Sequence, residues 1–297
     1  MGVQLGYYNS RRINHLFPTG KGEKIYIGSE MGRSDFIHLN YSELLNGDYI
    51  PCTLWLWLER NAMVNISDLA NRFPSIESLY LFRDLIPFEK ANLENLKTFS
   101  LGRFANKDSP KNLEHYQWNP EQILPNAKAL FYMEKSHFDL GGFLPSNLPN
   151  LEWLECHYLD DERLLLEKIC QFDAVTSLSL SKVGNNDILG AFNNRLKLLR
   201  LEGFGKKFSF DKIANQTSLE ILYINGYKKE FDLMQLQNLK LKEIQLLNCS
   251  KIVNAEALLE MDCLESLFVL SCKNALSAEL KLKLKERNFA YLNIDFT

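Results

Sequence analysis

Long apolar stretches are missing from this sequence, and so is any strong excess of charge. No run of about 18 apolar residues occurs, which excludes a conventional membrane-spanning helix. The first residues lack the basic region and apolar run of a signal peptide, so we expect a cytoplasmic protein with no membrane partner. The net charge is only −3, which gives no general attraction to nucleic acid.

Paired clusters of cysteine are missing as well. The cysteines are scattered singly, and without an export signal we expect them to be free thiols in a reducing compartment. Most stand beside or within the apolar pattern, where a free cysteine behaves as a small hydrophobic residue. The six cysteines are Cys52, Cys156, Cys170, Cys249, Cys263 and Cys272.

Motifs for nucleotide binding, hydrolysis and zinc binding are absent. The Gly203-Phe204-Gly205 segment has Phe208 where a dinucleotide site needs its third glycine. No G-x-S-x-G or H-E-x-x-H motif occurs. Cys156 and His157 resemble a nucleophile with its partner, but Cys156 falls at an inward position of the repeat pattern, where a thiol is inert. We therefore predict a non-enzymatic protein without a metal or cofactor.

What the sequence does contain is one phrase repeated four times. The phrase has the pattern L-x-x-L-x-L, and its copies begin at Leu196, Leu219, Leu241 and Leu264, a period of about 22–23 residues. The fourth and sixth positions lie two residues apart, so they point to the same side of an extended chain. One copy has too little apolar surface to fold alone, whereas stacked copies bury each other's leucines. The repeats therefore predict parallel strands laid side by side.

This pattern resembles that of the leucine-rich repeat superfamily. The family prefers Asn or Cys three positions after the last apolar residue, and Cys249 and Cys272 stand there in two repeats. Val183, Phe204 and Tyr227 occupy that position elsewhere, so the repeats are degenerate. The resemblance implies an α/β fold, a leucine-rich repeat solenoid of horseshoe shape. Its parallel β-sheet would line the concave face, with short helices or irregular returns on the convex face, as in bacterial single-domain members.

Residues 51–297 are predicted to form the solenoid, with about twelve strands. The fourth-position anchors of these strands are Leu54, Leu79, Phe99, Tyr116, Leu130, Leu154, Leu178, Leu199, Leu222, Ile244, Leu267 and Leu292. Tyr116 and Leu130 are so close in sequence that either this repeat is unusually tight or one of the two strands is wrong. Helical returns are predicted at Asp160–Cys170 and Ser277–Arg287 from their apolar spacing and start signals.

Residues 1–50 show no repeat. Ile25–Ile27 and Phe36–Leu39 have the alternation of short strands. A solenoid needs a cover over its first repeat, so we predict an N-terminal cap containing a β-hairpin. A separate functional domain is the alternative, although fifty residues is small for an independent core.

The face of the sheet opposite the leucines is predicted to bind a partner. Many of its residues are aromatic, and aromatic residues are the usual anchors of protein interfaces. The alternative is that these rings only pack on one another or on the N-terminal flank. The predicted partner-binding residues are Trp55, Trp57, Tyr80, Phe82, Phe131, Trp153, Glu155, His157, Arg200, Glu202, Tyr223, Gln245 and Phe268.

The sequence therefore predicts a protein-binding module that holds a partner protein on its concave face. By analogy with other repeat proteins, it would be an inhibitor or immunity protein that occludes a toxin. A substrate-recruiting adaptor or scaffold is the main alternative. An enzyme with a site in residues 1–50 is a weaker one, because no catalytic motif is visible there.

Overall fold

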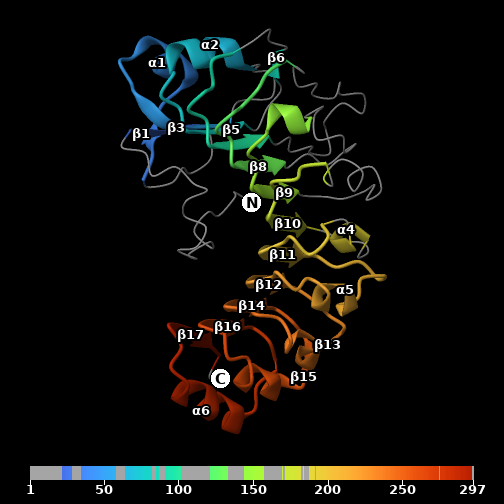
Figure 1. The fold of residues 1–297 in the computed structure, drawn as a ribbon. Coiled ribbons are helices and arrows are strands. Elements are labelled where there is room, and N and C mark those ends of the chain that lie inside the picture. Colours follow the sequence, from blue (N-terminus) through green and yellow to red (C-terminus); the bar gives the residue numbers. More distant parts are fainter. Residues whose placement is uncertain are drawn as a thin grey trace. The chain divides into compact units, whose positions relative to one another are not determined.

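The computed structural model of the chain describes most of the repeat region and part of the N-terminal flank. The described residues are 22–28, 35–57, 64–81, 85–86, 91–101, 121–132, 144–156, 169, 171–181, 183, 187–190, 192–273 and 275–295. The chain divides into two compact units, whose helices and strands are labelled in Figure 1. Unit 1 comprises Met1–Glu155 with Gln171–Ala174, and unit 2 comprises Cys156–Cys170 with Val175–Thr297.

Unit 1 is built on a ladder of neighbouring strands, parallel wherever their register is described. In spatial order the strands are β2 (Ile37–His38), β1 (Glu23–Ile27), β3 (Pro51–Leu56), β5 (Ser78–Leu81), β7 (Thr98–Leu101), β8 (Ala129–Tyr132) and β9 (Trp153–Cys156). The register aligns the apolar anchors, so that Leu54 faces Leu79, Leu79 faces Phe99, and Phe99 faces Leu130. All four anchors are fully buried, as the repeat pattern predicts.

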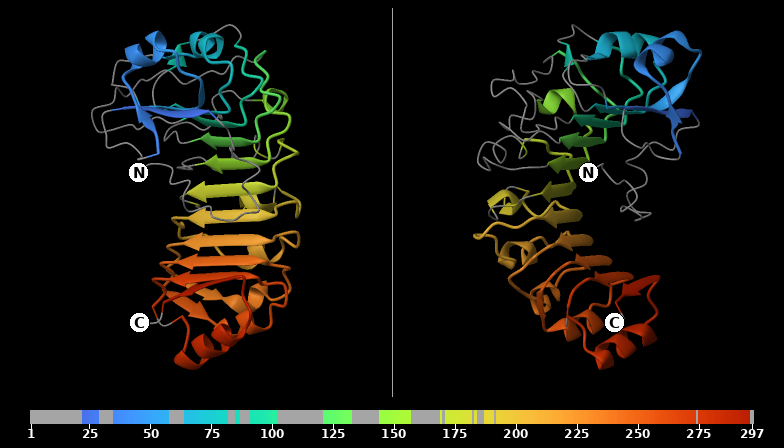
Figure 2. Two further views of the ribbon diagram at one scale, coloured as in Figure 1. Left: turned by 90° about the vertical axis from the view of Figure 1, so that its left-hand side faces the viewer. Right: turned by 180° about the vertical axis from the view of Figure 1, so that it is seen from behind.

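Unit 2 carries the regular repeats, and its strands are likewise parallel and in register (Figure 2). In spatial order they are β10 (Ser177–Ser181), β11 (Leu198–Glu202), β12 (Ile221–Asn225), β14 (Glu243–Leu247), β16 (Ser266–Leu270) and β17 (Tyr291–Ile294). Leu199, Leu222, Ile244 and Leu267 align across four neighbouring strands and are fully buried. Burial of each such side chain contributes about 1.5–3 kcal/mol.

Short helices and small two-stranded sheets make the returns between these strands. The helices are α1 (Tyr41–Asn46), α2 (Ile66–Arg72), η4 (Pro145–Asn147), α4 (Asp187–Gly190), α5 (Asp211–Ala214), η5 (Leu233–Leu236), η6 (Ala255–Leu259) and α6 (Ala278–Glu286). The small sheets pair β4 (Val64–Asn65) with β6 (Leu85–Ile86), and β13 (Glu230–Asp232) with β15 (Lys251–Val253). The predicted α/β leucine-rich repeat solenoid is therefore confirmed.

The predicted strands are confirmed with one exception. Eleven of the twelve anchors lie in strands of the structure. The exception is Tyr116, which lies outside the described residues. Strands β7 and β8 pair directly, with Phe99 opposite Leu130, so no strand separates them. The strand that follows Phe99 in the ladder is therefore the one at Leu130. These two anchors are 31 residues apart, compared with 20 from Leu79 to Phe99 and 24 from Leu130 to Leu154.

The described strands β1 and β2 do not form the β-hairpin expected in residues 1–50. Strands β1 and β2 pair in parallel, and β1 also pairs in parallel with β3, with Ile25 opposite Leu54. The flank therefore extends the repeat ladder, because Ile25 and Ile27 supply the same buried apolar alternation as a repeat strand. We propose that residues 1–50 cap unit 1, since β2 is only two residues long and a short edge strand discourages further pairing.

The predicted helix at Ser277–Arg287 is confirmed as α6. The Ser277 side chain accepts a hydrogen bond of 3.1 Å from the backbone N–H of Leu280, which satisfies one of the free donors at the helix start. Leu280 and Leu284 point inward and are buried, whereas Leu282 between them is exposed. The other predicted helix, Asp160–Cys170, lies outside the described residues except for Ile169, which is helical and buried.

Asparagine side chains at equivalent positions link three repeats of unit 1 to the preceding one. The amides of Asn95, Asn126 and Asn150 donate to the carbonyl oxygens of Pro74, Glu94 and Pro125, at 2.9, 2.6 and 2.8 Å. Each asparagine stands directly before the first residue of an L-x-x-L-x-L phrase. These bonds satisfy carbonyl groups that the irregular returns leave without a backbone partner.

Candidate partner-binding face

Most of the predicted binding residues of unit 1 are buried. Trp55 and Tyr80 are 3% and 2% exposed, and Phe131 and Trp153 are fully buried, as is nearly all of Glu155. These side chains alternate with the leucines, as predicted, but they are not an exposed wall. Trp57, just beyond β3, is part-buried, and Phe82 and His157 lie outside the described residues.

The buried rings of unit 1 pack against one another across the strands. The Trp55 ring stacks on Tyr80, with centroids 4.6 Å apart, and the edge of Phe36 meets Trp55 at 6.5 Å. Tyr80 and Phe131 lie 6.4 Å apart although β7 separates their strands. The residue between them in register is Ser100, which is buried and too small to keep the rings apart. These rings form an internal stack, so their expected exposure is corrected.

Unit 2 presents three rows of side chains on the corresponding face of its sheet. The strand register places them side by side, one residue from each strand. We call these three rows together the unit 2 face. Its central row consists of Ser179, Arg200, Tyr223, Gln245, Phe268 and Asn293, while Tyr291 and Glu202 belong to the rows on either side. The unit 2 face includes five predicted binding residues, Arg200, Glu202, Tyr223, Gln245 and Phe268. Of these, Tyr223 is only 7% exposed, so its expected exposure is corrected.

One end of the unit 2 face is polar and internally bonded. The Arg200 guanidinium lies over the Tyr223 ring, 4.9 Å from its centroid, and also forms an ion pair with Glu202. Glu202 accepts a second, longer hydrogen bond of 3.4 Å from the Asn225 amide. Asn225 in turn accepts from Asn248 at 3.0 Å. These contacts hold the charged groups in fixed positions, which lowers the entropy lost when a partner binds.

The other end of the unit 2 face is aromatic and more exposed. Phe268 is part-buried and stacks on Tyr291, with centroids 5.9 Å apart and 22° between the planes. Tyr291 is 66% exposed, one of the most exposed large hydrophobic side chains among the described residues. Next to this pair, Gln245 donates to Glu243 at 2.6 Å. Aromatic side chains, tyrosine among them, are enriched among the anchors of protein interfaces.

Sequence reasoning missed Tyr291 and Asn225 as surface residues. Both alternate with leucine anchors, Tyr291 directly before Leu292 and Asn225 directly after Ile224. The same alternation that identified Phe268 therefore indicates these two positions as well. The equivalent positions of other repeats, Trp153 before Leu154 and Glu202 opposite Asn225, are in the predicted set, but these two were not added to it.

The described residues contain neither a metal-binding cluster nor a membrane-spanning helix. In the part of the chain that the structure describes, no three His, Cys, Asp or Glu side chains gather closely enough to hold a metal ion. Within the same ranges, none of the helices has the length and apolar content needed to cross a bilayer.

Comparison with known proteins finds similarity in structure alone. No protein-family model and no curated protein matches the chain. Among solved structures, the chain is similar to an internalin from Listeria monocytogenes, with 17% sequence identity and a TM-score of 0.41. That match covers 78% of this chain and 64% of the internalin, so the chain spans less than two thirds of that protein's length. The fold assignment accordingly rests on the strand order, the register and the repeat period described above.

Proposed function

We propose that the chain is a non-enzymatic module that binds a partner protein through the unit 2 face. The observation that carries the proposal is the stacked pair of Phe268 and Tyr291, of which Tyr291 is 66% exposed. A large exposed ring loses much water contact when a partner covers it, and burial of apolar surface yields about 25 cal/mol per Å². The side chains that alternate with buried leucines are held by the strand ladder, so the anchor is preorganised.

The polar end of the unit 2 face supports the same proposal. Arg200 and Glu202 pair with each other, and Asn225 and Asn248 continue the hydrogen-bonded chain. Such groups add directional contacts around an aromatic anchor and select one partner against others. An aromatic end beside a charged end is therefore an arrangement suited to a protein partner, with no cofactor required.

Two alternative roles are compatible with that binding. Occlusion of a toxin, as by an immunity protein or inhibitor, requires only that the partner's working surface be covered. Recruitment as an adaptor or scaffold requires in addition a second surface for another protein. We favour the first role because the unit 2 face supplies all that it needs. No second aromatic surface of this kind is exposed among the described residues, since the unit 1 rings are buried.

The test is an affinity comparison with matched surface variants. The tagged chain is used to isolate protein from the organism that encodes it, and each purified candidate is titrated against wild type and variants. Tyr291→Ala is expected to weaken binding at least tenfold, which corresponds to about 1.4 kcal/mol. Met234→Ala is the control, because Met234 is 53% exposed but lies on η5, among the returns. Equal affinity of the two variants would contradict the proposal.

A further inference from the structure

Two cysteines of unit 2 stand at the same position of neighbouring repeats. Leu247 and Leu270 are partners in the β14–β16 register, and Cys249 and Cys272 each follow two residues later. The backbone N–H of Cys249 donates to the Cys272 sulfur at 3.3 Å. Neighbouring strands lie about 4.8 Å apart, within the Cα separation of about 4.4–6.8 Å that a disulfide requires. The two thiols are therefore placed for direct reaction with each other.

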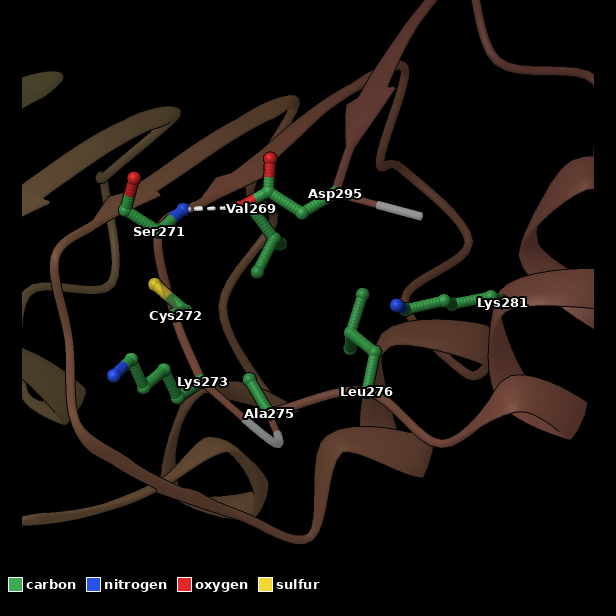
Figure 3. A pocket seen from close by; sticks show the side chains of 8 residues that line it. All are labelled: Val269, Ser271, Cys272, Lys273, Ala275, Leu276, Lys281 and Asp295. Carbon is green, nitrogen blue, oxygen red and sulfur yellow. Dashed lines mark hydrogen bonds between the residues drawn. The ribbon is translucent and has the colours of Figure 1, made fainter. Parts of the chain in front are cut away.

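The two cysteines differ in their access to solvent. Cys249 is 1% exposed, whereas Cys272 is part-exposed and lines a pocket of about 330 Å³. In Figure 3, Cys272 lies between Ser271 and Lys273 on one wall, and Lys281 of α6 points into the pocket from the opposite side. Small polar molecules can thus reach the Cys272 sulfur directly, whereas the Cys249 sulfur is buried next to it.

The hydrogen bonds around the pair favour ionisation of the outer thiol. The side chain of Cys249 donates to the Cys272 sulfur, and this bond, aided by the Cys249 backbone N–H, lowers the pKa of Cys272. The same side-chain bond, followed by burial, raises the pKa of Cys249. Since the thiolate is the reactive form of cysteine, Cys272 is the nucleophile of the pair.

We propose that Cys272 is an oxidation site that reacts with hydrogen peroxide from the pocket, and that Cys249 resolves the product as a disulfide. The Cys272 thiolate attacks one peroxide oxygen, the O–O bond breaks, and hydroxide leaves and takes up a proton to form water. The sulfur becomes a sulfenic acid and the peroxide is reduced. The Cys249 sulfur then attacks the Cys272 sulfur, the S–O bond breaks, and the oxygen leaves as water with the Cys249 proton. Two thiols and one peroxide thus give one disulfide and two waters.

Oxidation would change how the repeats are joined. The Cys249 thiol lies 3.4 Å from the carbonyl oxygen of Leu247, and the Cys272 thiol lies 3.4 Å from those of Leu246 and Leu270. The disulfide would link the two repeats covalently at a position where both sulfurs already lie against backbone carbonyl oxygens. This inference rests on the thiol pair alone and is independent of the proposed partner-binding function.

The experiment uses Cys263 as an internal control. Cys263 is exposed, whereas Cys272 is only part-exposed. The full chain is treated with hydrogen peroxide at neutral pH, remaining thiols are alkylated, and the digest is examined by mass spectrometry. Trypsin followed by cleavage after Glu265 separates Cys263 from Cys272, which otherwise share one tryptic peptide. The expected product is a Cys249–Cys272 disulfide, with Cys263 still alkylated.

Two variants distinguish the roles of the pair. Cys249→Ser is expected to abolish the disulfide and leave Cys272 as a sulfenic acid that dimedone traps. Cys272→Ser is expected to leave Cys249 unlabelled by dimedone. As a readout independent of oxidation, Cys272 of the wild type should react with iodoacetamide at least several-fold faster than Cys263. Cys249→Ala, which removes the side-chain donor, should reduce that ratio. Absence of the disulfide in a wild-type chain that is folded by circular dichroism, or faster reaction of Cys263, would overturn the proposal.

Discussion

The indole ring of Trp55 lies 4.6 Å from the ring of Tyr80, with only 19° between their planes. The two side chains stand opposite each other on β3 and β5, and both are buried. Aromatic pairs of this kind contribute about 0.5–1.5 kcal/mol beyond their burial. A tryptophan at this place therefore stabilises unit 1, whatever partner the chain binds.

Trp55→Ala is expected to lower the free energy of unfolding by about 3–5 kcal/mol, because it removes a large buried ring and leaves a cavity. Chemical denaturation monitored by circular dichroism measures this change. Tyr291→Ala is the control, since its ring is 66% exposed and its loss should change stability by only about 0.5 kcal/mol. A Trp55→Ala chain as stable as the control would show that the stack does not support the fold.

Leu222→Ala tests the leucine ladder itself. Leu222 is the fully buried anchor of β12, between Leu199 and Ile244 in register. Its truncation is expected to cost about 2–5 kcal/mol of unfolding free energy, measured by denaturation in urea. Leu282→Ala makes the matched comparison, because Leu282 is 61% exposed on α6 and its loss should cost far less. Similar costs for the two leucines would contradict the inward orientation of the anchors.

Ser277→Ala tests the start of α6. The Ser277 hydroxyl accepts the backbone N–H of Leu280, and loss of such a cap typically costs about 1 kcal/mol. Thermal unfolding should show a correspondingly lower midpoint. Ser277→Asp retains a side-chain acceptor at the same place and is expected to restore most of the loss. If aspartate destabilises the chain as much as alanine, the cap does not hold the helix.

Tyr227 makes a pH-dependent contribution to stability. Its ring is buried against Phe210 at 4.4 Å, and burial, reinforced by the charge of Asp211, raises the pKa of its phenol. Between the unfolded value of about 10 and the higher folded value, the unfolded chain releases this proton first, so stability falls as pH rises through that window. Below pH 10 the contribution is fully present.

Tyr227→Phe should remove this dependence. At pH 7 the variant and the wild type are expected to have similar free energies of unfolding, within about 0.5 kcal/mol. Above pH 10 the wild type should lose stability more steeply than the variant. Denaturation curves at several pH values measure the difference, and parallel pH profiles would rule out a buried, neutral phenol at this position.

The strand ladder of unit 2 was predictable because the same L-x-x-L-x-L phrase recurs in its sequence at a regular period. Leu199, Leu222 and Leu267 recur in the same context, and strand geometry then dictates which side each faces. The β1 strand was harder to place, because residues 23–27 have the alternation but not the full phrase. Its parallel pairing with β3 depends on contacts far apart in the sequence, which no local pattern records.

The burial of the unit 1 aromatics could not be predicted for a similar reason. Alternation correctly places Tyr80 and Phe131 on the face opposite the leucines. Whether that face is open depends on the neighbours of each ring, and Ser100 brings these two within 6.4 Å of each other. That neighbour becomes known only when β7 is found directly beside β8. Exposure is a property of the assembled sheet, whereas orientation is a property of the strand.

The direct pairing of β7 with β8 has a consequence for how such chains change in length. Phe99 and Leu130 sit opposite each other although more chain separates them than separates Leu79 from Phe99. The Asn126 amide still donates to the carbonyl oxygen of Glu94, so this hydrogen bond between neighbouring repeats does not depend on the length of the chain that connects them. The return that connects two directly paired strands can accordingly be longer or shorter while the other strands keep their pairing. Repeats of unequal length can thus share one scaffold, and new sequence can accumulate in a return while the adjoining strands keep their places.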